Sequence, residues 1–264
     1  MSIVINETKR RLEAGELAIG MGLRQARTMD TPQIAKACGF DWIFIDMEHA
    51  PYDVDMAAQM SQAALGVGVT PIVRVPGPQH FHASRLLDAG AMGIVVPHVD
   101  TAEQAAQSAS YCRYPPLGKR SLAGSPPQSR FAPMSTADAA AGVNKEILVV
   151  VMIESPQAVE NADAMAAIKG VDVLLIGSND LAAEMGITSQ LGHQKIKDAY
   201  GKVIAACKKH GKHPGMGGVY EPDLMKEYVD MGARFILGGS DFSFLMAGAK
   251  QRASTLRSML PGKS

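Results

Sequence analysis

Residues 42–49 read Trp-Ile-Phe-Ile-Asp-Met-Glu-His, a short run of β-forming apolar side chains that ends in two acids and a histidine. An apolar run of this length, flanked by glycine and proline, is typical of a parallel strand buried on both faces. Because charges are excluded from the interior of such a strand, Asp46, Glu48 and His49 are expected at its carboxyl end. In α/β proteins, ligands bind at that end of the parallel strands.

Further apolar runs of similar length alternate with segments of helical spacing along the whole chain. The expected strands cover residues 17–23, 42–45, 70–75, 93–96, 147–154, 171–176, 212–218 and 233–237. The expected helices cover residues 6–15, 31–39, 53–65, 82–89, 101–112, 155–168, 194–210 and 242–259. Eight strands alternating with helices over 264 residues predict an α/β protein, a single (β/α)8 TIM barrel that spans residues 1–264 as one domain.

An open, doubly wound sheet with a lid is the alternative fold, but no Gly-x-Gly-x-x-Gly turn follows the first expected strand. One region, residues 113–133, is irregular and rich in proline and glycine. A loop of this length inside a compact domain usually covers an active site or contacts a partner.

Composition excludes several classes of partner. Charge is balanced, with 26 basic and 26 acidic residues, so no overall field attracts nucleic acid or an anionic membrane. The longest apolar run, residues 147–153, is far shorter than the ~20 residues that a membrane span needs. We find no signal peptide at the start of the sequence. Cys38, Cys112 and Cys207 are scattered, which indicates reduced core thiols in a cytoplasmic protein.

Charged side chains recur at the expected strand ends, namely Asp46, Glu48, His49, Arg74, Glu154 and Asp180. Two carboxylates on neighbouring strands, Glu154 and Asp180, can bind one Mg²⁺ or Mn²⁺ and leave positions for water and substrate. Arg74 offers a planar donor group to a carboxylate or enolate oxygen. His49, oriented by Asp46, has the ring whose ordinary pKa best suits proton transfer.

Each of these residues also has a structural interpretation. Glu154 could form a salt bridge with a helix, and Asp180 could cap a helix that begins at Leu181. Arg74 could be a structural partner of Asp46 or Glu48. A lone histidine such as His49 is more often packed than catalytic. The concentration of these residues at strand ends, rather than any one of them, favours a site.

Several ordered motifs resemble one family. They are DMEHAP (46–51), VRVP (73–76), LLDAGAMGIVVPHVDTAEQA (86–105), RYPPLGKR (113–120), IESPQAVEN (153–161) and IGSNDL (176–181). In order and spacing they resemble the HpcH/HpaI family of metal-dependent aldolases, over about residues 17–242. The resemblance implies a reversible retro-aldol cleavage of a 4-hydroxy-2-oxo acid to pyruvate and an aldehyde.

The same resemblance implies roles for individual residues. Glu154 and Asp180 would hold a divalent cation (Mg²⁺, Mn²⁺ or Co²⁺), and His49, paired with Asp46, would be the base. Arg74 would hold the keto and enolate oxygen of pyruvate. The pyruvate carboxylate would be received by main-chain N–H groups of the segment Ser178, Asn179 and Asp180, at a helix start. The resemblance also implies a homo-oligomer, with a hexamer favoured, that exchanges the C-terminal helix 242–259.

The sequence departs from the family pattern at four places. Met152 stands where a glutamine is usual, Gly177-Ser178 replaces Gly-Pro, and Arg120-Ser121 replaces Arg-Gly. Met216-Gly217-Gly218 lacks the bulky apolar side chains often present there, which indicates more room for the aldehyde. The aldehyde is therefore the least defined part of the substrate.

Other readings of the sequence stay open. The glycines at 217–218 and 238–239 could bind a phosphorylated or CoA-linked substrate, although Asp241 would repel an anion. A non-catalytic scaffold is a further alternative. A Schiff-base aldolase is disfavoured because it needs a buried lysine, and none lies at the carboxyl end of an expected strand. Glu48 and His98, the latter also at a strand end, are left without a role.

Overall fold

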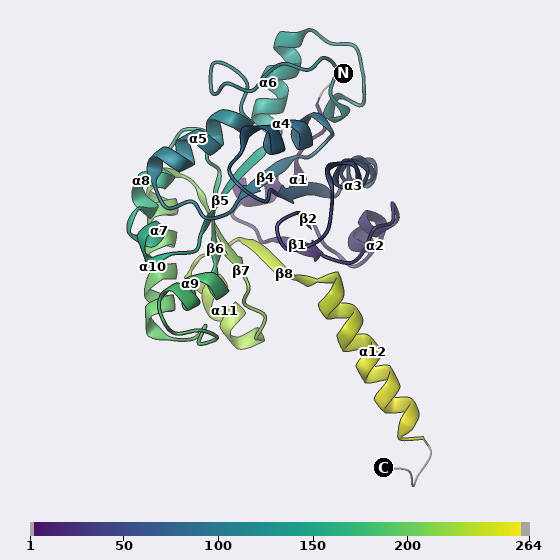
Figure 1. Ribbon diagram of the computed structural model, residues 1–264, viewed down its shortest axis with the longest axis vertical. Coiled ribbons are helices and arrows are strands. Elements are labelled where there is room, and N and C mark those ends of the chain that lie inside the picture. The colour runs from purple at the N-terminus through teal and green to yellow at the C-terminus, as the bar shows by residue number, and fades with distance from the viewer. Residues whose placement is uncertain (1–2, 260–264) are drawn as a thin grey trace.

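A computed structural model describes residues 3–259, and its eight strands form a closed parallel barrel in the order β1 to β8 (Figure 1). The predicted TIM barrel is confirmed. The strands are β1 (Ala18–Leu23), β2 (Trp42–Asp46), β3 (Thr70–Arg74), β4 (Gly93–Val96), β5 (Leu148–Ile153), β6 (Val173–Gly177), β7 (His213–Gly217) and β8 (Phe235–Ser240). Because each strand pairs with its sequence neighbour and β1 with β8, all eight carboxyl ends meet on one rim.

Helices lie between the strands along the chain and around the barrel, except α12, which projects away from it (Figure 1). They are α1 (Glu7–Glu13), α2 (Thr31–Ala37), α3 (Val54–Val67), α4 (His80–Asp88), α5 (Ala102–Cys112), α6 (Thr136–Glu146), α7 (Pro156–Glu160), α8 (Ala162–Ala166), α9 (Ser178–Glu184), α10 (Gln194–His210), α11 (Pro222–Met231) and α12 (Asp241–Arg257), with a 3-10 turn at Pro127–Ser129. Thr101 and Gln104 form a capping box at the start of α5.

The structure corrects the sequence reading of several helices. The single helix expected over residues 155–168 is two, α7 and α8, which meet at Asn161. Helices α6 and α11 were not expected, although Ser135 caps α6 and a proline opens α11, both ordinary helix-start signals. Of the three cysteines, Cys112 and Cys207 are buried as predicted, whereas Cys38 is exposed at the end of α2.

Two apolar layers hold the barrel together. One layer lies between strands and helices, and the other fills the barrel interior. In the interior, the Trp42 ring stacks on Phe235 with centroids 4.1 Å apart. Gly20 makes room for it, because a Cβ there would lie 2.2 Å from the Trp42 ring. The large aromatic side chains therefore fix which residues of β1 can face inward.

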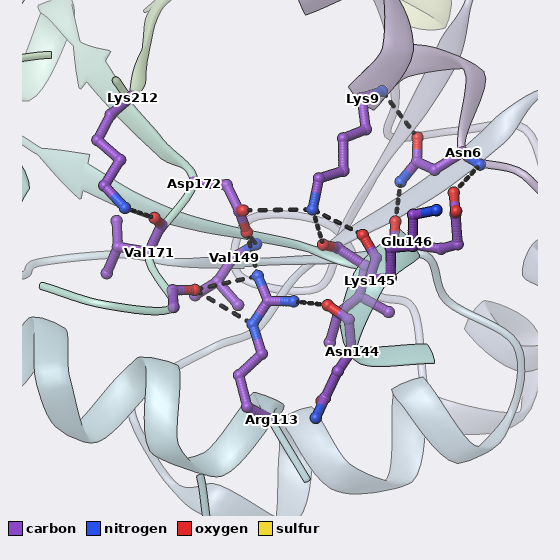
Figure 2. A network of polar contacts seen from close by, with 12 residues as sticks. Asn6, Lys9, Arg113, Asn144, Lys145, Glu146, Val149, Val171, Asp172 and Lys212 are labelled. Carbon is purple, nitrogen blue, oxygen red and sulfur yellow. Dashed lines mark hydrogen bonds and ion pairs between the residues drawn. The ribbon is translucent and has the colours of Figure 1, made fainter. Parts of the chain in front are cut away.

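A buried polar network closes the end of the barrel opposite the rim (Figure 2). Arg113, at the end of α5, donates to the main-chain oxygens of Asn144 and Gly170 and to the Asp172 carboxylate. Lys9 of α1 lies 3.5 Å from the other oxygen of Asp172. These contacts join the ends of α1, α5, α6 and β6, and at this end of a TIM barrel such residues serve stability rather than catalysis.

Helix α12 leaves the barrel instead of packing on it (Figure 1). None of its residues is buried, and apolar side chains such as Phe242, Phe244 and Leu245 are exposed along it. Its first residue, Asp241, ties it to the barrel by accepting hydrogen bonds from the main-chain N–H groups of residues 24–26. Among the helices of residues 3–259, none has the length and apolar character needed to cross a bilayer.

Candidate active site

Two adjoining cavities open at the carboxyl rim of the barrel. The first, of about 460 Å³, is lined by six of the predicted site residues: Asp46, His49, Arg74, Ser178, Asn179 and Asp180. The second, of about 480 Å³, is lined by Glu154, Asp180 and His98 among others. Asp180 faces both cavities, so the predicted residues lie around one continuous part of the rim.

A buried ion pair joins the ends of β2 and β3, where Asp46 and Arg74 are partners in the strand register. Arg74 Nε donates to Asp46 Oδ1 at 2.9 Å and Nη2 to Oδ2 at 2.7 Å, the two-pronged geometry of a guanidinium on a carboxylate. Burial acts to raise the pKa of Asp46, but the hydrogen bonds and charge of Arg74 outweigh it and hold that pKa below its usual value. Asp46 is therefore ionised at neutral pH.

Glu48 links this pair to two histidines, a connection that the sequence did not reveal. Its Oε2 lies 2.7 Å from Arg74 Nη1, and its Oε1 lies 3.2 Å from His98 Nε2. The His49 ring is near it as well, with Nε2 3.8 Å from Oε2. Arg74 is thus a paired residue, as the structural interpretation allowed, and it still borders the cavity.

His49 relates to Asp46 differently from the expected pairing. Asp46 Oδ1 accepts a hydrogen bond from the main-chain N–H of His49 at 3.2 Å and from that of Glu48 at 3.1 Å. Both oxygens of Asp46 also hold Arg74, so the carboxylate orients the backbone after β2 rather than the imidazole. The side chain of His49 is 54% exposed and faces the first cavity, where it can reach a ligand.

Glu154 is buried just after β5 and has a free oxygen. Its Oε2 accepts the main-chain N–H of His98 at 2.8 Å, whereas Oε1 is buried with no hydrogen-bond partner in the structure. Burial raises the pKa of Glu154, and the charges of Asp180 and Glu48 add to the rise, although His98 opposes it. His98 itself adopts a left-handed backbone, with φ 53°.

The segment after β6 forms the first turn of α9. Its N-cap is Gly177, so Asp180 lies inside the first turn and does not cap a helix beginning at Leu181. Asn179 and Asp180 are exposed to the cavities. The Ser178 side chain, in contrast, is fully buried and its Oγ lies 2.8 Å from the Tyr200 hydroxyl. Only the main chain of Ser178 remains for a ligand.

The donor set fits a divalent cation. Within residues 3–259, no group of three or more His, Cys, Asp or Glu side chains is arranged to hold an ion. Glu154 and Asp180 are instead two acids that repel each other, and the buried Oε1 of Glu154 has no hydrogen-bond partner among residues 3–259. A bound cation would offset the repulsion and give this oxygen a partner. Mg²⁺ and Mn²⁺ accept one or two carboxylates and take their remaining oxygens from water and substrate.

One glycine at the end of β8 is explained by packing. A Cβ at Gly239 would lie 2.6 Å from the Phe244 ring. The space that this glycine leaves is therefore occupied by Phe244 and not open to a ligand. The main-chain N–H groups of residues 24–26, the nearby donors of the β1 loop, are already occupied by Asp241. Asp241 is therefore an internal anchor for this loop.

Fold and site together define an enzyme of the TIM-barrel class, with acids, a guanidinium and an imidazole gathered on the carboxyl rim. The HpcH/HpaI aldolase/citrate lyase family matches residues 25–247, and the chain belongs to that family.

Similar proteins agree with this assignment. The chain is 38% identical over 260 residues to the 4-hydroxy-4-methyl-2-oxoglutarate aldolase of Hapsidospora irregularis, covering 96% of each chain. It is 36% identical over 256 residues to the 5-keto-4-deoxy-D-glucarate aldolase of Klebsiella pneumoniae, covering 97% of this chain and 98% of the relative. The crystal structure of an HpcH/HpaI aldolase from Desulfitobacterium hafniense superposes with a TM-score of 0.91 at 32% identity, covering 97% of this chain and 98% of that one. The chain is thus an aldolase-type lyase, and its family generally depends on a divalent metal ion.

Proposed function

We propose that this protein is a divalent-metal-dependent aldolase that cleaves a 4-hydroxy-2-oxo acid reversibly to pyruvate and an aldehyde. The observation that carries the proposal is the rim pair Glu154 and Asp180, in which the buried Glu154 Oε1 has no hydrogen-bond partner among residues 3–259. These two residues would hold Mg²⁺, Mn²⁺ or Co²⁺. When bound there, the cation supplies a Lewis acid that stabilises negative charge on an oxo group.

Arg74 is the residue that would receive the 2-oxo oxygen of pyruvate and its enolate. Asp46 occupies Nε and one N–H of Nη2, so at least one guanidinium N–H of the five remains for a ligand in the cavity. Because Asp46 and Glu48 hold the guanidinium from two sides, it is fixed in place before the substrate arrives. A fixed donor of this kind costs no reorganisation as charge develops on the oxygen.

His49 is the group that would move the proton of the 4-hydroxyl, directly or through water. It borders the first cavity together with Arg74, whereas His98 borders the second together with Glu154. His98 instead positions Glu154 through its main-chain N–H. The main-chain N–H groups at Ser178–Asp180 would receive the pyruvate carboxylate at the start of α9.

The substrates named for the two relatives, 4-hydroxy-4-methyl-2-oxoglutarate and 5-keto-4-deoxy-D-glucarate, are the first candidates for this chain. We also propose a cytoplasmic homo-oligomer, with a hexamer favoured, organised as one domain per chain. In that assembly α12 would pack on a neighbouring subunit, which accounts for its unburied apolar side chains.

The test is a panel of aldehydes incubated with pyruvate and Mn²⁺, with condensation products identified by mass. We expect at least one aldehyde to condense, EDTA to abolish the reaction and Mn²⁺ to restore it. Borohydride should trap no pyruvate adduct on the protein, since the mechanism involves no Schiff base. A panel with no product, or a trapped lysine adduct, would contradict the proposal.

A further inference from the structure

Arg24 is a charged residue of the first cavity that the proposed mechanism does not use. It follows β1 directly, its side chain is exposed, and it lines the cavity that holds His49, Arg74 and Asp180. Its Nη2 lies 3.4 Å from the main-chain oxygen of His49. The guanidinium is therefore beside the proposed base, on the side of the site where the 4-hydroxyl and the leaving aldehyde would be.

The charge of Arg24 has no ion-pair partner within residues 3–259, unlike that of Arg74, the other arginine of the cavity. Arg74 is paired with Asp46 and Glu48. Asp241 contacts the backbone of Arg24 and not its guanidinium: Oδ1 accepts the Arg24 main-chain N–H at 2.9 Å, and Oδ2 accepts those of Gln25 and Ala26. The guanidinium of Arg24 therefore forms no ion pair with a carboxylate of residues 3–259 and is free to bind an anion in the aldehyde half of the site.

We propose that Arg24 determines the charge of the substrate by binding a carboxylate carried by its aldehyde half, so that the preferred 4-hydroxy-2-oxo acid is a dicarboxylate. This inference rests on the proposed aldolase function and deepens it. A planar guanidinium matches a carboxylate with two parallel N–H donors.

A carboxylate suits this position better than a phosphate. A phosphate is usually bound with help from main-chain N–H groups, and those of residues 24–26 are occupied by Asp241. A single cation also balances the single charge of a carboxylate, whereas a phosphate near neutral pH carries about two.

The wall of the cavity around Arg24 has space for such a group. Gly217, the last residue of β7, and Gly218 after it line this cavity without side chains, and a Cβ at Gly217 would lie 3.5 Å or more from its neighbours. Tyr220, half exposed, borders the same cavity. Partial burial raises the pKa of its hydroxyl, against the charges of Arg24 and Arg74, so it stays a neutral donor that could share the carboxylate.

The experiment compares acceptors of similar size with pyruvate and Mn²⁺: glyoxylate, which carries a carboxylate, glycolaldehyde, which is neutral, and glycolaldehyde phosphate. We expect the wild type to prefer glyoxylate. Arg24→Gln should lower kcat/KM for glyoxylate by roughly 30–100-fold and change it for glycolaldehyde by less than about threefold. Arg24→Lys should recover part of the loss, because it restores the charge without the planar fork.

Arg27→Gln is the matched control on the same loop. Arg27 is also an exposed arginine, but its Nη1 donates to the Pro51 main-chain oxygen at 3.2 Å and it lies over the Tyr52 ring, outside the lining of the cavity. We expect Arg27→Gln to leave kcat/KM unchanged for both glyoxylate and glycolaldehyde. Equal losses for Arg24→Gln on charged and neutral aldehydes, or a wild-type preference for the neutral or phosphorylated acceptor, would overturn the inference.

Deuterium exchange at the pyruvate methyl group separates this inference from the proposed function, because it requires no aldehyde. Exchange in the wild type, followed by NMR in D₂O with Mn²⁺, should persist at nearly the same rate in Arg24→Gln. Loss of exchange in the variant would show that Arg24 acts on pyruvate and would overturn the specificity role. Absence of exchange in the wild type would instead contradict the aldolase proposal.

Discussion

Gly177→Ala tests whether Glu154 is held in the position that a metal ion requires. Gly177 ends β6 next to Glu154, and a Cβ there would lie 2.7 Å from both Cγ and Oε1 of Glu154. The backbone itself, at φ −87° and ψ 83°, stays in the negative-φ half of the map that L residues adopt. Any effect of the substitution therefore comes from the displaced carboxylate and not from backbone strain.

The magnitude follows from this contact. The added Cβ is about 0.7 Å short of ordinary van der Waals distance, and the Glu154 side chain is anchored at its far end by the His98 N–H. Turning Glu154 off its rotamer costs about 0.5–1.5 kcal/mol of stability. Metal sites tolerate ligand errors of only about 0.2 Å. We therefore expect Mn²⁺ affinity to fall about 10–100-fold, the range found when a ligand loses its support.

Mn²⁺ binding measured by electron paramagnetic resonance gives this quantity without a catalytic assay. Gly217→Ala is the control, because Gly217 is the register partner of Gly177 on β7. Its added Cβ would make ordinary contacts, 3.5 Å from the Ile176 oxygen and 3.6 Å from Leu175 Cδ1. We expect Gly217→Ala to bind Mn²⁺ like the wild type. If Gly177→Ala also binds within twofold of the wild type, Glu154 is not a ligand and the reasoning fails.

Three further outcomes are expected. Asp46→Asn should lower the unfolding free energy by about 3 kcal/mol at neutral pH, as breaking a buried ion pair does. Because the folded pKa of Asp46 is lowered, this loss of stability should be complete above about pH 4 and vanish as pH falls through the lower pKa. A loss that stays constant in denaturant titrations down to acid pH would contradict the pairing. Gly20→Ala places a Cβ 2.2 Å from the Trp42 ring and should lower the unfolding free energy by about 1–3 kcal/mol or more. Gly66→Ala in α3, where a Cβ meets nothing within 4 Å, should raise it by up to about 1 kcal/mol. Calorimetry that finds the two variants equally stable would refute the packing account. Leu245→Asp on α12 should reduce the molar mass measured by light scattering without lowering the melting temperature of the barrel, and an unchanged mass would remove α12 from the subunit contact.

Local sequence patterns were enough to predict the barrel and most of the rim. Every strand found in the structure overlaps an expected one, because an apolar run bounded by turn residues needs no distant information to be recognised. The strand-end rule then placed Asp46, Arg74, Glu154 and Asp180 together, since closure of a parallel barrel brings all carboxyl ends to one rim. Helices α6 and α11 were missed although an N-cap serine and a first-turn proline mark their starts.

Tertiary structure alone decided which side chain contacts which. The sequence placed Asp46 with His49, but the register of β2 and β3 sets Asp46 opposite Arg74, and a guanidinium holds a buried carboxylate more strongly than an exposed imidazole can. The link from Glu48 to His98 joins residues fifty positions apart, and no local pattern carries it. The unpaired charge of Arg24 is equally invisible in the sequence, because it depends on Asp241, more than two hundred residues away, being occupied by the main chain. Residue types and strand ends are local properties, whereas the pairing of charges is set by the register and closure of the sheet.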